Sequence, residues 1–145
     1  MSRNEEASKP LVVRRFVPAP RERVFDAWLD PARLARFMRP GRIGRATAEV
    51  DGRIGGRFRI VMFHPDRSTG TEHTGEYLLI DRPARLSFTW QSVNTDNRPT
   101  TVMIEFLVRD GGTEVVLTHS QLPPDQIDSH RKGWGTIVEL LTQAS

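Results

Sequence analysis

The sequence predicts one α+β domain, in which an antiparallel sheet of six or seven strands wraps around a long C-terminal helix. Three observations predict it. Apolar residues alternate with period two over most of the chain after Gly41, the breaks between these segments are short turns, and the last segment returns to a helical period. Short turns favour antiparallel neighbours, because parallel neighbours need a crossover of a dozen or more residues.

The N-terminal part reads as a strand followed by two short helices. Residues 1–10 are polar and are expected to form a mobile tail, and residues 11–145 are expected to form the single domain. Residues 11–17 are rich in β-branched and aromatic types, which favours a strand. A first helix is predicted to begin after Pro20, and Asp30 with Pro31 predicts the capped start of a second. Pro40 and Gly41 end that second helix.

Each predicted strand of the middle part has one apolar face. The inward residues are expected to be Phe58, Ile60 and Met62, then Leu86, Phe88 and Trp90, then Val102, Ile104, Phe106 and Val108. The turns between strands contain residues that favour tight reversals, among them Asp51-Gly52, Pro65-Asp66, Arg82-Pro83, Asn94 to Pro99 and Asp110-Gly111-Gly112.

The last segment predicts the long amphipathic helix. Its apolar face carries Ile127, His130, Trp134, Ile137, Val138 and Leu141, while Lys132, Thr136, Glu139 and Gln143 lie opposite. Gly133 and Gly135 flank Trp134, although each is unfavourable in a helix by about 1 kcal/mol relative to alanine. We interpret the two glycines first as a site of tight packing between helix and sheet. The alternative is the wall of a ligand site.

Composition and charge restrict the class of protein. There are no cysteines, so disulfides, thiolate catalysis and cysteine-bound metal are excluded. No apolar run is long enough to span a membrane, and a cytoplasmic protein is expected. Residues 1–60 contain fourteen Lys and Arg against seven Asp and Glu, but no nucleic-acid motif accompanies them. We therefore expect neither nucleic acid nor a membrane as partner. Capture of an acidic protein partner by this arginine-rich half is left open.

A search for catalytic motifs finds none. The four histidines lack a metal-ligand spacing, the glycines do not form a phosphate loop, and no serine lies in a nucleophile elbow. We expect no metal and no cofactor. His119 shares a predicted strand face with Val115 and Leu117 and should point inward. We interpret it first as a core histidine bonded to backbone or a hydroxyl, and second as a ligand contact or general base.

Five segments in register resemble a known family. They are Phe16 to Phe37 (FVPAPRERVFDAWLDPARLARF), Asp51 to Met62 (DGRIGGRFRIVM), Gly75 to Trp90 (GEYLLIDRPARLSFTW), Gly112 to His119 (GTEVVLTH) and His130 to Leu141 (HRKGWGTIVELL). The chain thereby resembles the bacterial homologues of the activator of heat-shock-protein-ninety ATPase, within the superfamily of START-like, polyketide-cyclase and birch-pollen-allergen domains. The resemblance implies a helix-grip fold. At Phe37 many members have tryptophan, which is expected to alter the shape of the pocket.

The resemblance also implies a cavity between sheet and C-terminal helix that binds a small, largely apolar molecule. Its expected wall is Phe37, Phe58, Met62, Tyr77, Trp90, His119, Trp134 and Val138, with His119 or Tyr77 orienting the polar end of the ligand. Two alternatives follow from the same superfamily: a cyclase or dehydratase using His119 as acid or base, and a protein-interaction module. Stimulation of the chaperone is not expected, because the eukaryotic activator has an additional large N-terminal domain. Homodimer formation is left open.

Overall fold

The computed structural model describes residues 9–41, 43–66 and 68–144. Most of the predicted N-terminal tail, residues 1–10, thus lies outside the described residues. Within them, seven strands form one antiparallel sheet, and three α-helices and two short 3₁₀ segments complete the fold. In chain order the elements are β1 (Leu11–Val17), α2 (Arg21–Ala27), α3 (Pro31–Phe37), β2 (Arg45–Val50), β3 (Arg57–Phe63), β4 (Gly70–Asp81), β5 (Arg85–Trp90), η1 (Val93–Thr95), β6 (Thr100–Arg109), β7 (Gly112–Ser120), η2 (Pro124–Gln126) and α4 (Ile127–Ala144).

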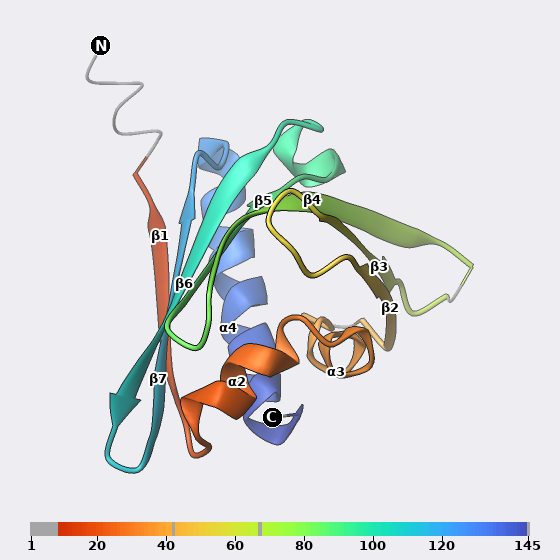
Figure 1. The fold of residues 1–145 in the computed structure, drawn as a ribbon. Helices are drawn as coiled ribbons and strands as arrows, with labels where there is room; N and C mark the ends of the chain where they lie inside the picture. The colour runs from red at the N-terminus through yellow and green to blue at the C-terminus, as the bar shows by residue number, and fades with distance from the viewer. Residues whose placement is uncertain (1–8, 42, 67, 145) are drawn as a thin grey trace.

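The sheet curls around α4 (Figure 1). Its strand order is β1-β7-β6-β5-β4-β3-β2, so the first and last strands of the chain pair with each other and β2 forms the opposite edge. Helix α4 contacts β1 on one side and α3 on the other, and α3 also packs against β2. This is the helix-grip arrangement that the resemblance implies, with two short helices after the first strand.

The two short helices begin where the sequence predicts. Pro20 precedes α2, and the Asp30 carboxylate accepts hydrogen bonds from the backbone N–H groups of Ala32 (3.0 Å) and Arg33 (3.5 Å) at the start of α3. Arg82 donates two hydrogen bonds, of 2.8 and 2.9 Å, to the carboxylate of Asp26. This ion pair fastens α2 to the turn between β4 and β5, and its hydrogen bonding lowers the pKa of Asp26.

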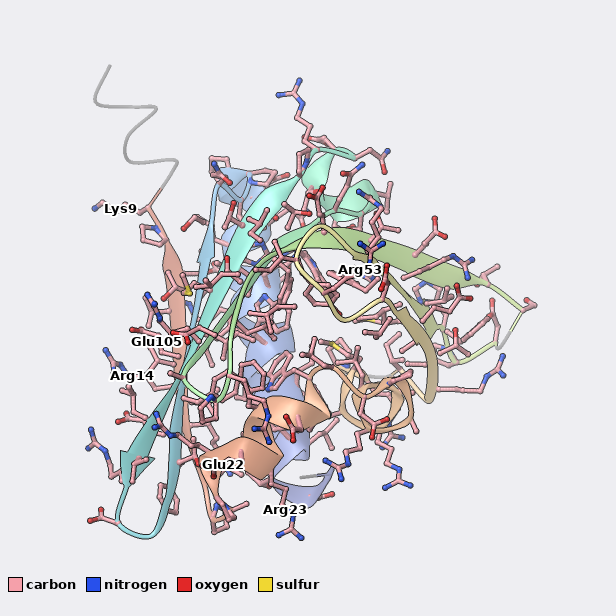
Figure 2. All side chains as sticks on the ribbon, in the orientation of Figure 1. Lys9, Arg14, Glu22, Arg23, Arg53 and Glu105 are labelled. Carbon is pink, nitrogen blue, oxygen red and sulfur yellow. The ribbon has the colours of Figure 1, made fainter. Side chains whose placement is uncertain are left out.

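Strand register determines which side chains face α4. In the β6–β7 pair, Ile104 lies opposite Leu117 and Val102 lies opposite His119, and all four side chains are buried. The intervening residues point to the outer face of the sheet, where Arg14 and Glu105 lie (Figure 2). The alternation that predicted the strands is therefore an alternation between core and outer surface. The prediction was wrong at Val108, which was expected to face inward and is 70% exposed near the end of β6.

The centre of the fold is filled by aromatic side chains. The Phe58 ring lies 5.3 Å from that of Phe88 and 5.5 Å from that of Tyr77, measured between centroids. Gly75 lies under Phe58, and a Cβ atom there would overlap both that ring and the carbonyl oxygen of Thr89. The interior around Phe58 is therefore packed, so space for another molecule must lie elsewhere.

No helix in the described part of the chain combines the length and the apolar character needed to cross a membrane.

Replacing Asp30 with alanine is expected to lower the free energy of unfolding by about 1 kcal/mol, because two N–H groups at the start of α3 lose their acceptor. Urea denaturation measures this change. Asp30→Asn keeps an acceptor oxygen and is expected to retain most of the stability. Equal losses in the two variants would contradict the role of Asp30 as a cap.

Candidate ligand-binding cavity

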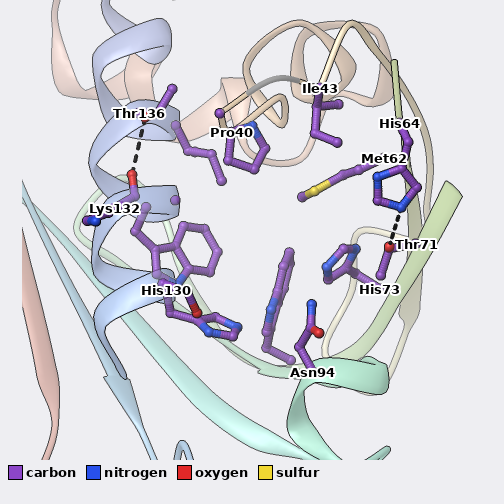
Figure 3. A pocket seen from close by; sticks show the side chains of 16 residues that line it. Pro40, Ile43, Met62, His64, Thr71, His73, Asn94, His130, Lys132 and Thr136 are labelled. Carbon is purple, nitrogen blue, oxygen red and sulfur yellow. Dashed lines mark hydrogen bonds between the residues drawn. The ribbon is translucent and has the colours of Figure 1, made fainter. Parts of the chain in front are cut away.

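A cavity of about 380 Å³ lies beside α4, between that helix, strands β3 and β4, and the segment that joins α3 to β2 (Figure 3). This volume falls in the range of small-molecule sites. The lining residues are Pro40, Gly41, Ile43, Met62, His64, Thr71, His73, Trp90, Asn94, Ser129, His130, Lys132, Gly133, Trp134, Thr136 and Ile137. Apolar and aromatic groups dominate, none of these residues is acidic, and Lys132 is the one with a permanent cation.

Three of the residues expected to form the wall lie together in this cavity: Met62, Trp90 and Trp134. Phe58 and Tyr77 instead border a second space of about 10 Å³, which is at the lower limit for one water molecule. Burial there raises the pKa of Tyr77. Neither Phe58 nor Tyr77 reaches the larger cavity.

Phe37 and Val138 line neither space and are fully buried among other core side chains. The Phe37 ring packs edge-on against Trp28 at 4.9 Å. The predicted wall is thus divided between a packed centre and a hollow flank. Apolar periodicity marks inward residues in both places and does not distinguish them.

His119 belongs to a chain of hydrogen bonds that joins α4 to three strands. The Trp134 indole donates from Nε1 to Nδ1 of His119 over 2.9 Å. On its other side, Nε2 of His119 lies 2.7 Å from the Thr100 hydroxyl, which donates to the main-chain oxygen of Trp90 at 2.6 Å. The hydroxyl partner expected for a core histidine is therefore present.

The direction of every bond in this chain follows from its ends. An indole N–H can only donate and a carbonyl can only accept, so Nδ1 of His119 carries no hydrogen and Nε2 donates to Thr100. Burial, followed by the nearby charge of His130, lowers the pKa of His119 to about 3. The ring is neutral and both nitrogens are occupied. As a correction to the expectation, His119 does not line the cavity and has no free atom to orient or deprotonate a ligand.

His73 is a cavity residue that the sequence analysis did not single out. It lies on β4, is 6% exposed, and points into the cavity (Figure 3). Its Nδ1 is buried and has no hydrogen-bond partner. Burial, with the charge of His130 as the second cause, lowers the pKa of His73 to about 4. Alternation along β4, which places His73 on the same face as Gly75 and Tyr77, was the signal that could have found it.

Trp90 presents a second unsatisfied nitrogen. Its ring lies 4.8 Å from that of His73 and 4.9 Å from that of Trp134, so it separates the two. The indole Nε1 of Trp90 is buried and has no hydrogen-bond partner. Most buried polar side-chain atoms in native proteins have a partner. Trp28 Nε1, which is away from this cavity, is buried without a partner in the same way, so the unpartnered nitrogens do not by themselves mark the cavity.

The cavity reaches past the apolar stripe of α4 onto its flank. Lys132 and Thr136, which the helical pattern assigns to the polar face, are lining residues, as is Gly133 between them (Figure 3). His130 also lines the cavity. Its Nδ1 lies 2.9 Å from the carbonyl oxygen of Gln126 and must donate to it, which leaves Nε2 as an acceptor. Burial lowers the pKa of His130.

Tight packing does not explain the glycines beside Trp134, which corrects our first interpretation. A Cβ atom at Gly133 would meet only the Pro40 side chain, at 3.6 Å, and one at Gly135 would meet nothing within 4 Å. Gly133 borders the cavity, whereas Gly135 does not. The absence of a side chain at Gly133 leaves the cavity open on the helix side.

Most of the described arginines in residues 33–59 interact with other side chains of the protein. The ion pairs are Arg33 with Asp30, Arg53 with Asp51, Arg57 with Glu76, and Arg59 with Glu49 and Glu72. The guanidinium of Arg45 lies 4.1 Å from the centre of the Phe63 ring. Arg42 lies outside the described residues.

Among the residues that are described, no group of three or more His, Asp or Glu side chains is arranged to hold a metal ion.

Comparison with known proteins establishes the family. The model of the family "Activator of Hsp90 ATPase homolog 1-like protein" matches residues 18–145. The chain belongs to this family. Among curated proteins, the comparison finds no match.

Several solved structures share the fold of this protein. A protein from Chromobacterium violaceum is 21% identical with a TM-score of 0.82, over 92% of this chain and 94% of that chain. A protein from Arthrobacter aurescens is 20% identical with a TM-score of 0.82, over 96% and 86%. An AHSA1-like protein from Aeromonas hydrophila is 25% identical with a TM-score of 0.75, over 94% and 91%.

Acid is expected to destabilise the protein through its buried histidines. The folded-state pKa values of His73 and His119 lie near 4 and 3, below the ordinary value of 6.5, so the unfolded chain takes up protons first as the pH falls. Above about pH 6.5 the two neutral histidines make their full contribution to the free energy of unfolding. This contribution decreases toward pH 4, by roughly 2 kcal/mol per histidine between about pH 7 and pH 5. Urea denaturation at the two pH values measures the loss.

In that experiment His119→Gln is expected to reduce the loss by roughly 2 kcal/mol, because one of the buried imidazoles no longer titrates. The exposed His64 provides the control, and His64→Gln is expected to leave the loss unchanged. An unchanged loss in His119→Gln would contradict the assignment.

Alanine at Gly133 or at Gly135 is expected to raise the free energy of unfolding by about 0.5–1 kcal/mol, because both positions are helical and neither Cβ meets a close neighbour. Thermal or urea denaturation of the single variants measures this. A loss of stability in either variant would show that the backbone there is more tightly packed than described.

Proposed function

We propose that this protein binds a small, largely apolar molecule in the cavity on the flank of α4. The observation that carries the proposal is the cavity itself: about 380 Å³, with Met62, Trp90 and Trp134 as apolar wall and a few polar side chains, such as Thr71 and Asn94, among the other lining residues. A mostly apolar cavity with a few polar atoms is the usual form of a small-molecule site.

Rigidity of the wall supports the same proposal. Trp134 is held by its hydrogen bond to His119, and its indole contacts both Trp90 and Trp28, at centroid distances of 4.9 and 6.5 Å. A site whose aromatic wall is fixed before binding loses little conformational entropy when the ligand enters. Methionine at position 62 adds an adaptable apolar contact.

The enzymatic alternative no longer has a candidate for the general acid or base. It relied on His119 as acid or base, and both nitrogens of His119 form hydrogen bonds within the protein. A general base must reach the proton that it removes. We therefore limit the proposed function to binding.

Filling the cavity from the helix side is expected to abolish binding. The neutral dye N-phenylnaphthylamine is the probe, and energy transfer from tryptophan to the dye reports its binding. Gly133→Phe is expected to weaken binding by more than about tenfold, since the new ring occupies the cavity.

Gly135→Phe is the matched control, because Gly135 lies two residues away on the same helix and does not border the cavity. It is expected to bind the dye as the wild type does. Absence of dye binding to the wild type, or equal binding by both phenylalanine variants, would contradict the proposed site.

A further inference from the structure

We propose that the outer face of strands β1, β7 and β6 binds a second copy of this chain, with a two-fold axis that runs nearly along β7. The face is on the side of the sheet opposite α4 and the cavity, so this docking does not depend on the proposed function. Three features carry the inference: exposed apolar side chains on both flanking strands, an arginine and a glutamate on opposite flanks, and an arrangement that is complementary to itself.

Strand pairing arranges the outward side chains of this face in rows. Strand β7 lies in the middle, with β1 on one side and β6 on the other. Because residues paired across adjacent strands lie side by side about 4.8 Å apart, each row contains one side chain from every strand. In order along the face, the rows are Phe16–Glu114–Leu107, Arg14–Val116–Glu105 and Val12–Thr118–Met103.

Apolar side chains occupy the corners of this face. Phe16 is 43% exposed, Val12 and Leu107 are each 41% exposed, and Met103 at the fourth corner is half-buried. The Phe16 ring reaches from β1 over Gly112 of β7, where an added Cβ atom would lie 2.7 Å from it. Exposed apolar groups gathered on one face with polar residues among them are typical of an interaction surface.

The middle row has an arginine and a glutamate whose charges are only partly used within the chain. Arg85, which lies opposite Glu105 on β5, pairs with another carboxylate at 3.1 Å. Within the described parts of the chain, Glu105 itself has no ion-pair partner. Arg14 lies 3.8 Å from Glu114, which has a closer partner in Arg109 at 2.6 Å. The Arg14 side chain is 63% exposed and is therefore available to a second carboxylate.

A two-fold axis along β7 makes the face complementary to itself. Rotation by 180° about this axis exchanges the two flanks, so β1 of one copy lies over β6 of the other. Arg14 of each copy then faces Glu105 of the other copy, which gives two ion pairs across Val116 (Figure 2 shows both side chains on the outer face). The apolar contacts that the same rotation produces are Phe16 over Leu107 and Val12 over Met103.

The geometry and the charge of the face suit a second copy. Two sheets that pack face to face lie about 10 Å apart with their strands within about 30° of each other, which is the arrangement that this axis gives. Arg14 and Arg109 balance Glu105 and Glu114 on the face, so two copies do not repel each other. The same balance gives no reason to expect a strongly charged partner such as a nucleic acid.

The size of the face predicts a weak dimer. Three strands about 4.8 Å apart and about 25 Å long cover roughly 400 Å² per copy. Stable complexes bury about 800 Å² per partner. A dissociation constant of about 10–100 μM is therefore expected.

Sedimentation equilibrium at about 50 mM salt measures the self-association, because surface charges are weakly screened under that condition. The weight-average mass is expected to rise with concentration from the 16.5 kDa of one chain toward twice that value. A mass that stays at that of one chain up to about 500 μM would overturn the inference and leave the face to a different partner.

Reversing one charge of the middle row is expected to weaken the dimer. Arg14→Glu and Glu105→Arg each place like charges opposite each other at two positions, and each is expected to raise the dissociation constant by more than about tenfold. Arg23→Glu is the control, because Arg23 is an exposed residue of α2 away from this face (Figure 2). It changes the net charge as Arg14→Glu does and is expected to leave the dissociation constant unchanged.

Mixing the two charge-reversal variants gives the decisive measurement. In a mixed dimer of Arg14→Glu with Glu105→Arg, both facing pairs again consist of one acidic and one basic side chain. The equimolar mixture is therefore expected to associate about as tightly as the wild type, although each variant alone is monomeric at the same concentration. Since neither chain is altered by mixing, this recovery cannot come from a rearrangement within one chain.

Three results would overturn the inference. They are a dimer that persists in both charge-reversal variants, an equal loss in Arg23→Glu, and an equimolar mixture that stays monomeric. Circular dichroism establishes that the variants are folded. If a reversal variant does not fold, Leu107→Ser tests the same face, and it is expected to raise the dissociation constant by more than about tenfold because its contact with Phe16 is lost twice. An unchanged dissociation constant in Leu107→Ser would also overturn the inference.

Discussion

The hydrogen-bond chain from Trp134 through His119 and Thr100 to the backbone of Trp90 holds the closing helix against the sheet. It connects α4 with β7, β6 and the end of β5 in one buried line. Each donor and acceptor in it has a single allowed direction, so the chain specifies the neutral form of His119 and the orientation of the Trp134 ring. A buried network that is completely satisfied rigidifies its surroundings.

The position of the cavity follows from that constraint. With Trp134 fixed toward His119, its ring lines the cavity and contacts both Trp28 and Trp90. On the central side Phe58, Tyr77 and Phe88 leave room for about one water. On the flank of α4, Gly133 has no side chain, and the cavity separates the helix from strands β3 and β4. The Trp90 indole, which borders both spaces, thus separates the packed core from the hollow site.

Two inward histidines have opposite roles because their neighbours differ. His119 faces a hydroxyl and an indole N–H, and both of its nitrogens are used within the protein. His73 faces the flat surface of Trp90 across 4.8 Å, and its Nδ1 is not used. The same residue type on inward strand faces therefore has both ring nitrogens hydrogen-bonded in one case and Nδ1 without a partner in the other.

The sequence by itself determined the order of elements, the inward faces of β3, β5 and β7 and of β6 as far as Phe106, and the cap at Asp30, because these depend on local periodicity and on nearby backbone groups. It also placed His119 and Trp134 in the interior. Only the tertiary structure decided that His119 bonds to Trp134, that Nδ1 of His73 has no hydrogen-bond partner, and that Lys132 and Thr136 line a cavity. These features depend on which strands and which side of α4 lie next to each other. The apolar pattern along the chain does not determine how much space remains between these elements.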